Sequence, residues 1–459
     1  MAIPTTVRPH QATPSQRRDT RRVAVATVVG TTIEWYDFFL YANAAGLVFA
    51  QLYFEPAGPQ LAILLSFGSV GVSFLFRPLG AFLAGHFGDI LGRKAMLVIT
   101  LILMGASTVL IGVLPTYAQI GVMAPVLLLL LRILQGISAG GEWGGAVLMA
   151  VEHAPDAKRG RFGAFPQLGV PLGLLLATGM LAIMTAVAPG EAFIEWGWRV
   201  PFLLSIVLIV VGFVVRRSVE ESPVFLEIRD RAQRTKKPVV VLFRKHWRLV
   251  LLAALTFAGM NSAGYMTTGG YIQNYATNPD GPVGLDRQSV LVAVSISAVT
   301  WLIFTMLAGI VSDRIGRRAT YIVGWIALIA AIFPLFALVN TGNIWLLCLG
   351  LCLFTVGLGF TYGQQAAFYA ELFPASIRFS GVSISYALGS ILGGAFAPMI
   401  ATALVQATGT SVSVGVYLTI MATIAFAATL AIRDRTGIPL GPDHEEEQSA
   451  PAIYGMSRT

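Results

Sequence analysis

Twelve long apolar runs restrict what this chain can fold into. They lie near residues 23–52, 61–86, 95–114, 121–150, 162–187, 198–215, 248–275, 288–311, 319–340, 344–369, 380–406 and 412–432. An α-helix needs roughly 20 apolar residues to cross a lipid bilayer. The pattern predicts an all-α membrane protein with twelve transmembrane helices.

Composition agrees with this prediction. Hydrophobic residues make up 56% of the chain, and Asp, Glu, Lys and Arg only 12%, about half of the ~25% usual in soluble domains. This excludes an ordinary soluble enzyme and a disordered protein. The net charge of +8 does not indicate a nucleic-acid partner, because the basic residues form short clusters between apolar runs. The first run is too long for a signal peptide, and we interpret it as an uncleaved span.

The basic residues predict the orientation in the membrane. If the N-terminus is cytoplasmic, all but four of the 31 Lys and Arg residues fall on the cytoplasmic side. The exceptions are Arg199 and Arg287 in outer loops, and Arg77 and Arg132 inside spans. Cytoplasmic loops of membrane proteins are rich in Lys and Arg. We therefore expect a multi-pass protein of the inner (cytoplasmic) membrane with both termini in the cytoplasm.

Two repeated motifs divide the chain into similar halves. A G-x-x-x-D-x-x-G loop followed by two basic residues occurs at 85–94 and again at 309–318. An E-x-x-P motif, with an Arg four residues after the Pro, occurs at 152–159 and again at 371–378. The similar offsets indicate duplication. We predict five segments: an N-terminal tail (1–22), a six-helix half (23–215), a central linker (216–247), a second six-helix half (248–432) and a C-terminal tail (433–459).

The duplicated loop resembles that of the major facilitator superfamily. Three further stretches, E-W-Y-D-F at 34–38, R-I-L-Q-G with G-G-E-W-G-G at 132–145, and E-S-P-V-F at 221–225, resemble the metabolite:proton symporter family. That family includes proline/betaine, shikimate and 2-oxoglutarate transporters. The resemblance implies two packed six-helix halves with a solute site near the bilayer midplane. It also implies alternating access, with a small organic solute and protons as partners.

Four charged residues lie inside predicted spans: Glu34, Asp37, Arg77 and Arg132. A charge at the bilayer centre costs roughly 2.5–3.5 kcal/mol even on insertion scales, so such residues are candidates for function. We predict that Asp37 is the leading proton carrier and Glu34 the second. Either arginine could release these carboxylates or hold an anionic group of the substrate. The alternative is a permanent salt-bridge network that only fixes the helices.

Other polar residues in the spans extend the predicted substrate-binding network. In the first half these are Tyr41, Gln135 and Glu142; in the second half they are Asn261, Tyr265, Gln273, Gln364 and Gln365. The second half has Trp301 at the position that matches Arg77. We therefore expect charge in the first half and neutral hydrogen-bonding groups in the second. Gly136 and Gly140 predict a small-residue face for close helix packing.

Charged residues near the cytoplasmic helix ends predict a gate. The candidates are Asp89, Arg93, Glu152, Glu221, Asp313, Arg317 and Glu371. We expect Arg93 to pair with Glu152, and Arg317 with Glu371. The family resemblance implies that such a latch holds the cytoplasmic side closed. Ordinary solvated charges at the membrane surface are the alternative.

These observations predict a secondary transporter rather than an enzyme. The sequence has no G-x-x-x-x-G-K-[ST] loop for ATP, no arrangement of catalytic residues and no metal-ligand spacing, so we expect neither cofactor nor metal. The expected substrate is a small carboxylate or zwitterion, carried by a monomer. An uncoupled facilitator, an exporter and a transporter-like solute sensor remain as alternatives, and the sequence leaves the substrate unidentified.

Overall fold

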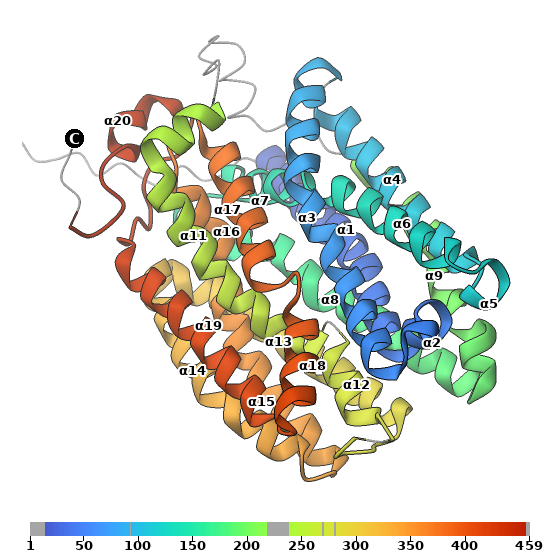
Figure 1. The fold of residues 1–459 in the computed structure, drawn as a ribbon. Coiled ribbons are helices and arrows are strands. Elements are labelled where there is room, and N and C mark those ends of the chain that lie inside the picture. Colours follow the sequence, from blue (N-terminus) through green and yellow to red (C-terminus); the bar gives the residue numbers. More distant parts are fainter. Residues whose placement is uncertain (1–13, 92, 218–237, 269, 280, 456–459) are drawn as a thin grey trace, which may run out of the picture.

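The computed structural model describes residues 14–91, 93–217, 238–268, 270–279 and 281–455. Within these ranges, the side chains of 14–21, 84–97, 216–217, 238 and 265–268 lie outside the description. The described residues form helices, joined by loops and one isolated bridge between Ile432 and Ile453. The all-α prediction is therefore confirmed (Figure 1).

The first half contains six membrane-crossing segments, two of them interrupted. They are α1 (Pro14–Ala44) with η1 (Ala45–Phe49) and α2 (Ala50–Tyr53), α3 (Pro59–Leu91), α4 (Arg93–Val113), α6 (Met123–Ala139) with α7 (Glu142–Glu152), α8 (Arg159–Val187) and α9 (Arg199–Arg217). The short α5 (Tyr117–Ile120) lies in the loop before α6.

The second half repeats this arrangement. Its segments are α11 (Pro238–Thr268) with α12 (Tyr271–Thr277), α13 (Arg287–Ile315), α14 (Arg317–Val339), α15 (Ile344–Tyr362) with α16 (Gln365–Leu372), α17 (Arg378–Gly393) with α18 (Ala397–Thr408), and α19 (Val412–Ala431). The short α20 (Glu445–Gln448) follows them.

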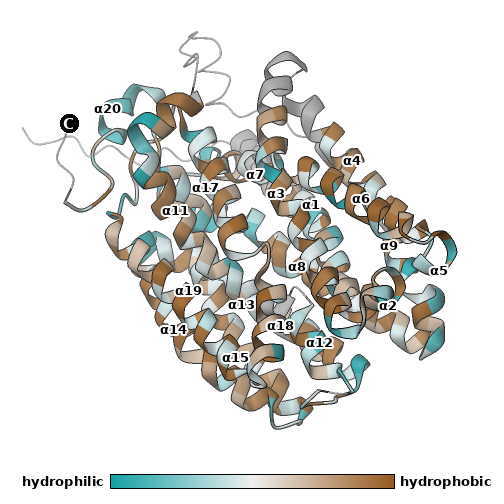
Figure 2. Ribbon diagram, viewed as in Figure 1, coloured by the Kyte–Doolittle hydropathy of each residue, from teal (hydrophilic) through white to brown (hydrophobic). Residues whose placement is uncertain are grey.

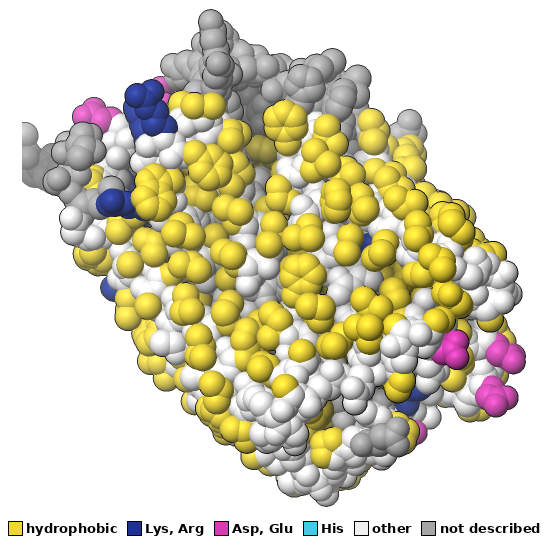
Figure 3. Space-filling view, in the orientation of Figure 1, with side chains coloured by type: hydrophobic (Ala, Val, Ile, Leu, Met, Phe, Trp, Pro, Cys, Tyr) yellow, Lys and Arg dark blue, Asp and Glu magenta, His cyan; other side chains and the backbone are white. Residues whose placement is uncertain are grey.

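Length and hydropathy fit a membrane-spanning protein. Within the described chain, 10 helical segments are long and apolar enough to cross a membrane. The helix α4, with its apolar part Val98–Val113, and the helix α11 correspond to the other two predicted spans. Large apolar side chains such as Phe82, Val187 and Trp345 are exposed on the outside of the bundle. Figure 2 shows how hydrophobic residues dominate the helices, and Figure 3 shows a broad apolar surface on the face in view, which suits contact with lipid.

Glycines allow the close helix approach that the sequence predicts. A Cβ atom added at Gly140 would lie 2.0 Å from the backbone oxygen of Arg77, and one at Gly136 would lie 2.1 Å from that of Ser73. No side chain fits at such distances, so α3 and α6 pack backbone to backbone. Gly363 approaches the backbone oxygen of Thr305 in the same way, at 2.1 Å. Both halves thus use glycine where a broken helix crosses its neighbour.

The two halves contact each other along several pairs of segments. The helix α8 packs against α13 and α16, α3 packs against α17 and α18, α7 packs against α16 and α17, and α1 contacts α11. On the predicted outer side, Gln273 Nε2 donates a hydrogen bond to Asn43 Oδ1 at 2.6 Å, and Asn274 Nδ2 donates one to the Gly46 oxygen at 3.1 Å. The predicted cytoplasmic side is closed by ion pairs that are described below. The protein is therefore in an occluded conformation.

Candidate functional site

The four charged residues predicted inside spans are buried in the first half. Glu34 and Asp37 on α1, Arg77 on α3 and Arg132 on α6 are each at most 3% exposed. Burying a charge is unfavourable unless specific groups compensate it. The partners of each residue therefore indicate what it does.

Neutral groups hold Arg132 firmly. Its Nη1 donates a hydrogen bond to Gln135 Oε1 at 2.7 Å. Its Nη2 donates to the Val70 oxygen at 3.0 Å and to Ser73 Oγ at 2.8 Å. The guanidinium carbon also lies 3.9 Å from the centre of the Tyr41 ring, a cation–π contact. Arg132 thus ties α6 to α3 with most of its donors in use.

Hydroxyl groups surround Asp37. Ser205 Oγ on α9 donates a hydrogen bond to Asp37 Oδ1 at 2.8 Å, and the Thr108 hydroxyl on α4 is placed to form a second. Thr108 Oγ1 in turn accepts a hydrogen bond from Gln135 Nε2 at 2.8 Å. A polar chain therefore runs from Arg132 through Gln135 and Thr108 to Asp37. Sequence reasoning missed Ser205 and Thr108, because single hydroxyls in apolar spans give no distinctive signal.

Aromatic rings surround Arg77. Its guanidinium carbon lies 4.4 Å from the ring centre of Phe74, 5.7 Å from that of Trp35 and 5.8 Å from that of Phe38. Among the described residues, no hydrogen bond or ion pair involves this guanidinium, and its buried Nε has no partner. Arg77 and Arg132 line one small cavity. Arg77 is therefore the more available of the two cations.

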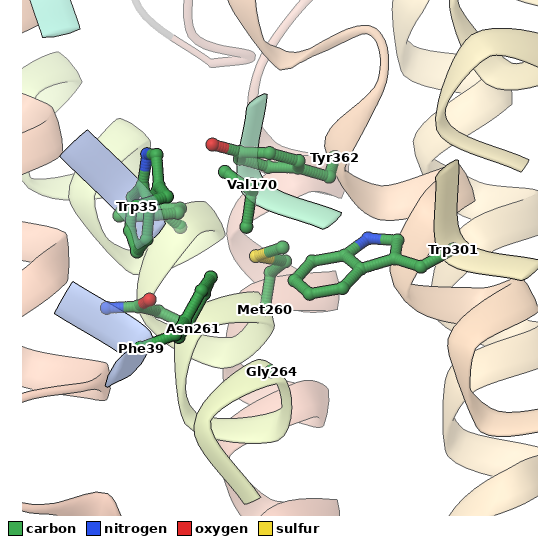
Figure 4. Close-up of a pocket in the computed structure, with 9 residues that line it drawn as sticks. Trp35, Phe39, Val170, Met260, Asn261, Gly264, Trp301 and Tyr362 are labelled. Atoms are coloured by element: carbon green, nitrogen blue, oxygen red, sulfur yellow. The ribbon is translucent and has the colours of Figure 1, made fainter. Parts of the chain in front are cut away.

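A chamber lies between the halves, next to these charges (Figure 4). It has about 240 Å³ of empty space and takes side chains from α1, α8, α11, α13 and α15: Trp35, Phe39, Val170, Phe257, Met260, Asn261, Gly264, Trp301 and Tyr362. We call this space the central chamber.

Stacked aromatic rings link the halves next to the central chamber. The rings of Trp143 on α7 and Tyr386 on α17 are 3.6 Å apart and nearly parallel, at 11°. Tyr386 also stacks on Phe257, a chamber residue, at 4.3 Å. Trp143 Nε1 donates a hydrogen bond to Gln167 Oε1 at 3.0 Å, which fixes the indole. The pair lies between the chamber and the ion pairs of the predicted cytoplasmic side.

Those ion pairs cross between the halves. Arg378 Nη1 lies 3.6 Å from Glu152 Oε1, and Arg159 Nη1 lies 4.0 Å from Glu371 Oε1. The glutamate of each E-x-x-P motif therefore pairs with the arginine of the other half's motif. Sequence reasoning expected partners within each half and did not find this exchange, although both arginines belong to the repeated motif.

The expected ion pair inside the second half is also present. Arg317 Nε lies 3.2 Å from Glu371 Oε2, and Arg317 Nη1 lies 2.8 Å from Asp313 Oδ1. Asp313 also accepts a hydrogen bond from the backbone N–H of Gly160 at 2.7 Å, which adds a link to the first half. Of the other gate candidates, Asp89, Arg93 and Glu221 lie outside the residues whose side chains are described.

Residues 432–453, which we call the C-terminal strap, cross these ion pairs. The Ile438 oxygen accepts a hydrogen bond from Arg159 Nη1 at 2.6 Å, and the Leu440 oxygen accepts one from Arg378 Nη1 at 2.9 Å. Gln448 is 1% exposed, and its Oε1 accepts a bond from Arg378 Nη2 at 3.1 Å. Burial lowers the pKa of Arg435 in the strap, and Glu447 partly offsets this effect. The sequence showed only a polar tail here.

The remaining predicted residues do not form one cluster. Asn261 lines the central chamber, whereas Gln273 lies in the contact on the predicted outer side. Gln364 Nε2 donates to the Phe360 oxygen of its own segment at 2.7 Å. Glu142 and Gln365 are buried at the first residues of α7 and α16. The side chain of Tyr265 lies outside the description.

Two family models match this chain. The model described as "Sugar (and other) transporter" matches residues 23–244. The model described as "Major Facilitator Superfamily" matches residues 281–453. Together they cover most of both halves.

Full-length relatives are similar to the chain. An inner membrane metabolite transport protein of Escherichia coli, YhjE, is 41% identical over 413 residues, which are 89% of this chain and 93% of the relative. The shikimate transporter of Escherichia coli is 38% identical and covers 93% of this chain and 97% of its own length. The proline/betaine transporter of Salmonella typhimurium is 32% identical, with 95% and 88% covered.

Solved structures share the fold. The crystal structure of a D-xylose-proton symporter superimposes with a TM-score of 0.70 at 18% identity, and the match covers 94% of this chain and 99% of that one. At this identity the likeness shows the fold alone, with its twelve helices in two halves.

Proposed function

We propose that this chain, which belongs to the major facilitator superfamily of membrane transporters, is a secondary active transporter rather than an enzyme. It would carry a small organic carboxylate or zwitterion together with protons. The relatives that are transporters of metabolites, shikimate and proline or betaine support this substrate range. The proposed location is the cytoplasmic membrane, in agreement with the name of the YhjE relative.

The surroundings of Asp37 are the observation that carries proton coupling. Its carboxyl group is 1% exposed, and its hydrogen-bonding partners Ser205 and Thr108 are neutral. Burial without a cation favours the protonated form, whereas contact with water favours the ionised form. Alternating access moves a midplane site between these two environments. Asp37 would thus take up a proton on one side and release it on the other.

Thr108 fits this role because its single hydroxyl proton has two possible acceptors. Its Oγ1 lies 3.1 Å from the Met104 backbone oxygen and is also placed to bond Asp37. The hydroxyl would donate to Asp37 when that residue is ionised, and to the Met104 oxygen when Asp37 is protonated. Glu34 is the second proposed proton site; it lies close enough to Tyr386 for electrostatic interaction, as does Arg77.

The two arginines take different parts in this proposal. Arg77 would bind the substrate carboxylate, since its planar guanidinium can hold two carboxylate oxygens at once. Arg132 would position the helices and the polar chain that leads to Asp37, because its donors are already engaged.

The gate would work by exchanging weak contacts. Opening the predicted cytoplasmic side must break the Glu152–Arg378 and Arg159–Glu371 pairs. Opening the other side must break the Gln273–Asn43 hydrogen bond. Both ion pairs are largely buried, and the cost of desolvating buried charges offsets much of their mutual attraction, so a bound solute could shift this balance.

Uptake into proteoliposomes tests the proposal. The vesicles are made alkaline inside and offered labelled proline, betaine, shikimate, 2-oxoglutarate and benzoate, with and without a protonophore. We expect one or more compounds to accumulate above equilibrium, and the protonophore to abolish the accumulation. Uptake that only equilibrates would support an uncoupled facilitator and reject symport. Solute efflux driven by proton entry would support an exporter.

A further inference from the structure

We infer that the substrate is a small monocarboxylate and that the site discriminates against dicarboxylates, because Arg77 is the one cation beside the central chamber whose guanidinium has no hydrogen-bond or ion-pair partner among the described residues. This inference rests on the proposed function and assigns a substrate class to the same site. It follows from the contacts of Arg77, from the walls of the central chamber and from the asymmetry of the two halves.

Two aromatic residues connect Arg77 to the central chamber. The Trp35 ring lies 5.7 Å from the guanidinium carbon of Arg77 and also lines the chamber. Tyr386 lies within electrostatic range of Arg77 and stacks on Phe257 in the chamber wall. A small solute could therefore place its carboxylate at Arg77 and the rest of its body in the chamber.

The second arginine does not offer an equal site. Arg132 donates to Gln135, Val70 and Ser73 and also packs over the Tyr41 ring. A carboxylate that bound Arg132 would have to displace these buried partners, and leaving buried polar groups without hydrogen bonds is unfavourable. The substrate anion is therefore expected at Arg77.

None of the side chains that line the central chamber carries a charge. Five of the lining groups are the aromatic rings of Trp35, Phe39, Phe257, Trp301 and Tyr362, and Asn261 supplies a neutral amide. Figure 4 shows Trp35 on one side of the chamber and the Trp301 indole on the other. A second carboxylate placed here would be buried without a cation, which is strongly unfavourable. An apolar ring or a methylated ammonium would instead meet aromatic faces.

The repeat explains why there is one cation. Trp301 stands at the position that matches Arg77 in the duplicated sequence, and it is 1% exposed in the chamber wall. One half thus supplies a cation and the other an aromatic ring at corresponding places. Two arginines at these positions would suit a dicarboxylate. One arginine and one aromatic ring instead suit a monocarboxylate whose remaining part is uncharged or cationic.

Direct binding to the purified full-length chain tests this inference without a proton gradient. Calorimetry compares matched compounds at a pH where every carboxylate is ionised: benzoate with terephthalate, and betaine with 2-oxoglutarate. We expect benzoate, betaine or both to bind, and each dicarboxylate to bind at least about tenfold more weakly than the better monocarboxylate. Which monocarboxylate binds would distinguish a ring from a methylated ammonium as the body. Equal or tighter binding of a dicarboxylate, or no binding by any of the four, would overturn the inference.

Variants assign the selectivity to particular residues. Arg77→Gln should lose at least about tenfold in monocarboxylate affinity. Trp301→Arg should reduce the preference for monocarboxylates, whereas Trp301→Phe keeps a ring and should preserve it. If Trp301→Arg does not fold, Arg77→Gln decides alone, and unchanged affinity in that variant would contradict the assignment.

The outcome is separable from the test of symport. Selective monocarboxylate binding without gradient-driven uptake would reject symport and leave this inference standing. Gradient-driven uptake of a dicarboxylate would support symport and overturn this inference.

Discussion

At the scale of single residues, the buried charges differ in what satisfies them. Arg132 is held by a glutamine, a serine and a backbone oxygen, whereas Arg77 meets mainly aromatic faces. Asp37 is bonded by hydroxyls. Groups that are fully satisfied fix a structure, and groups that are not remain available for a ligand or a proton.

Ser205 gives a prediction at this scale. Its hydroxyl stabilises the ionised form of Asp37, so Ser205→Ala should favour the protonated form. Proton release would then need a higher pH, and the pH profile of gradient-driven uptake should move upward by about one unit. Ser205→Thr keeps a hydroxyl and serves as the control. A profile that stays in place in the Ala variant would show that this hydrogen bond does not tune the proton site.

At the scale of elements, glycines and aromatic rings set how the helices meet. The helices α3 and α6 approach so closely that a Cβ at Gly140 would lie 2.0 Å from the Arg77 backbone oxygen. The helices α7 and α17 meet through the Trp143–Tyr386 stack, beside Gly144, where a Cβ would lie 2.2 Å from Ser383 Oγ. The first contact positions Arg77, and the second lies between the central chamber and the ion pairs of the predicted cytoplasmic side.

Gly140→Ala should destabilise the protein. The added methyl group has no space against α3, and overpacking of this kind typically costs 1–3 kcal/mol. Gly145→Ala is the matched control, because nothing lies within 4 Å of a Cβ there. Thermal unfolding of the purified variants in detergent should show a lower midpoint for Gly140→Ala alone. Equal midpoints would mean that the close approach of α3 and α6 is not required.

Trp143→Ala should open the path between the central chamber and the predicted cytoplasmic side. Asn261→Cys, which places a thiol in the wall of the central chamber, reports access of a water-soluble thiol reagent in inside-out vesicles when Cys348 and Cys352 are replaced by Ala. Labelling should rise severalfold in Trp143→Ala and remain low in Trp143→Phe, since phenylalanine still offers a stacking ring. Unchanged labelling in the Ala variant would show that the stack does not form the closure.

At the scale of the whole molecule, duplication produces reciprocal contacts between the halves. Each E-x-x-P glutamate pairs with the arginine of the opposite motif, at 3.6 Å for Glu152–Arg378 and 4.0 Å for Arg159–Glu371. The C-terminal strap adds backbone oxygens to both arginines. Closure of this side is therefore shared by both halves and the strap.

Arg378→Gln should shift the protein away from the closed arrangement on this side. It removes the ion pair with Glu152 and contact with the C-terminal strap. The control, Arg318→Gln, alters contacts within the second half and with Tyr454 beyond the strap. Spin labels at the exposed Lys158 and Arg314, in the Cys348→Ala and Cys352→Ala background, measure the separation of the halves. We expect longer distances in Arg378→Gln only. Identical distributions in both variants would contradict a role for the cross pairs in closure.

The sequence predicted the fold better than the site. Apolar runs give twelve helices directly, and repeated motifs give the two halves; the Arg317–Glu371 pair was also expected, and it is present. Trp143 and Tyr386 looked like ordinary packing residues, because their partners come from opposite halves. The cross pairs and the C-terminal strap also depend on how the halves face each other, which neither spacing nor composition reveals.

We propose that Asp37 carries the coupled proton, and a comparison of the parent chain with one variant decides this. Proteoliposomes with the parent chain or with Asp37→Asn are assayed for accumulation driven by a pH gradient and for exchange of labelled against unlabelled substrate at equal pH. We predict that Asp37→Asn loses accumulation but keeps exchange, because the site still binds and moves solute without a proton. Undiminished gradient-driven accumulation in Asp37→Asn would contradict the account.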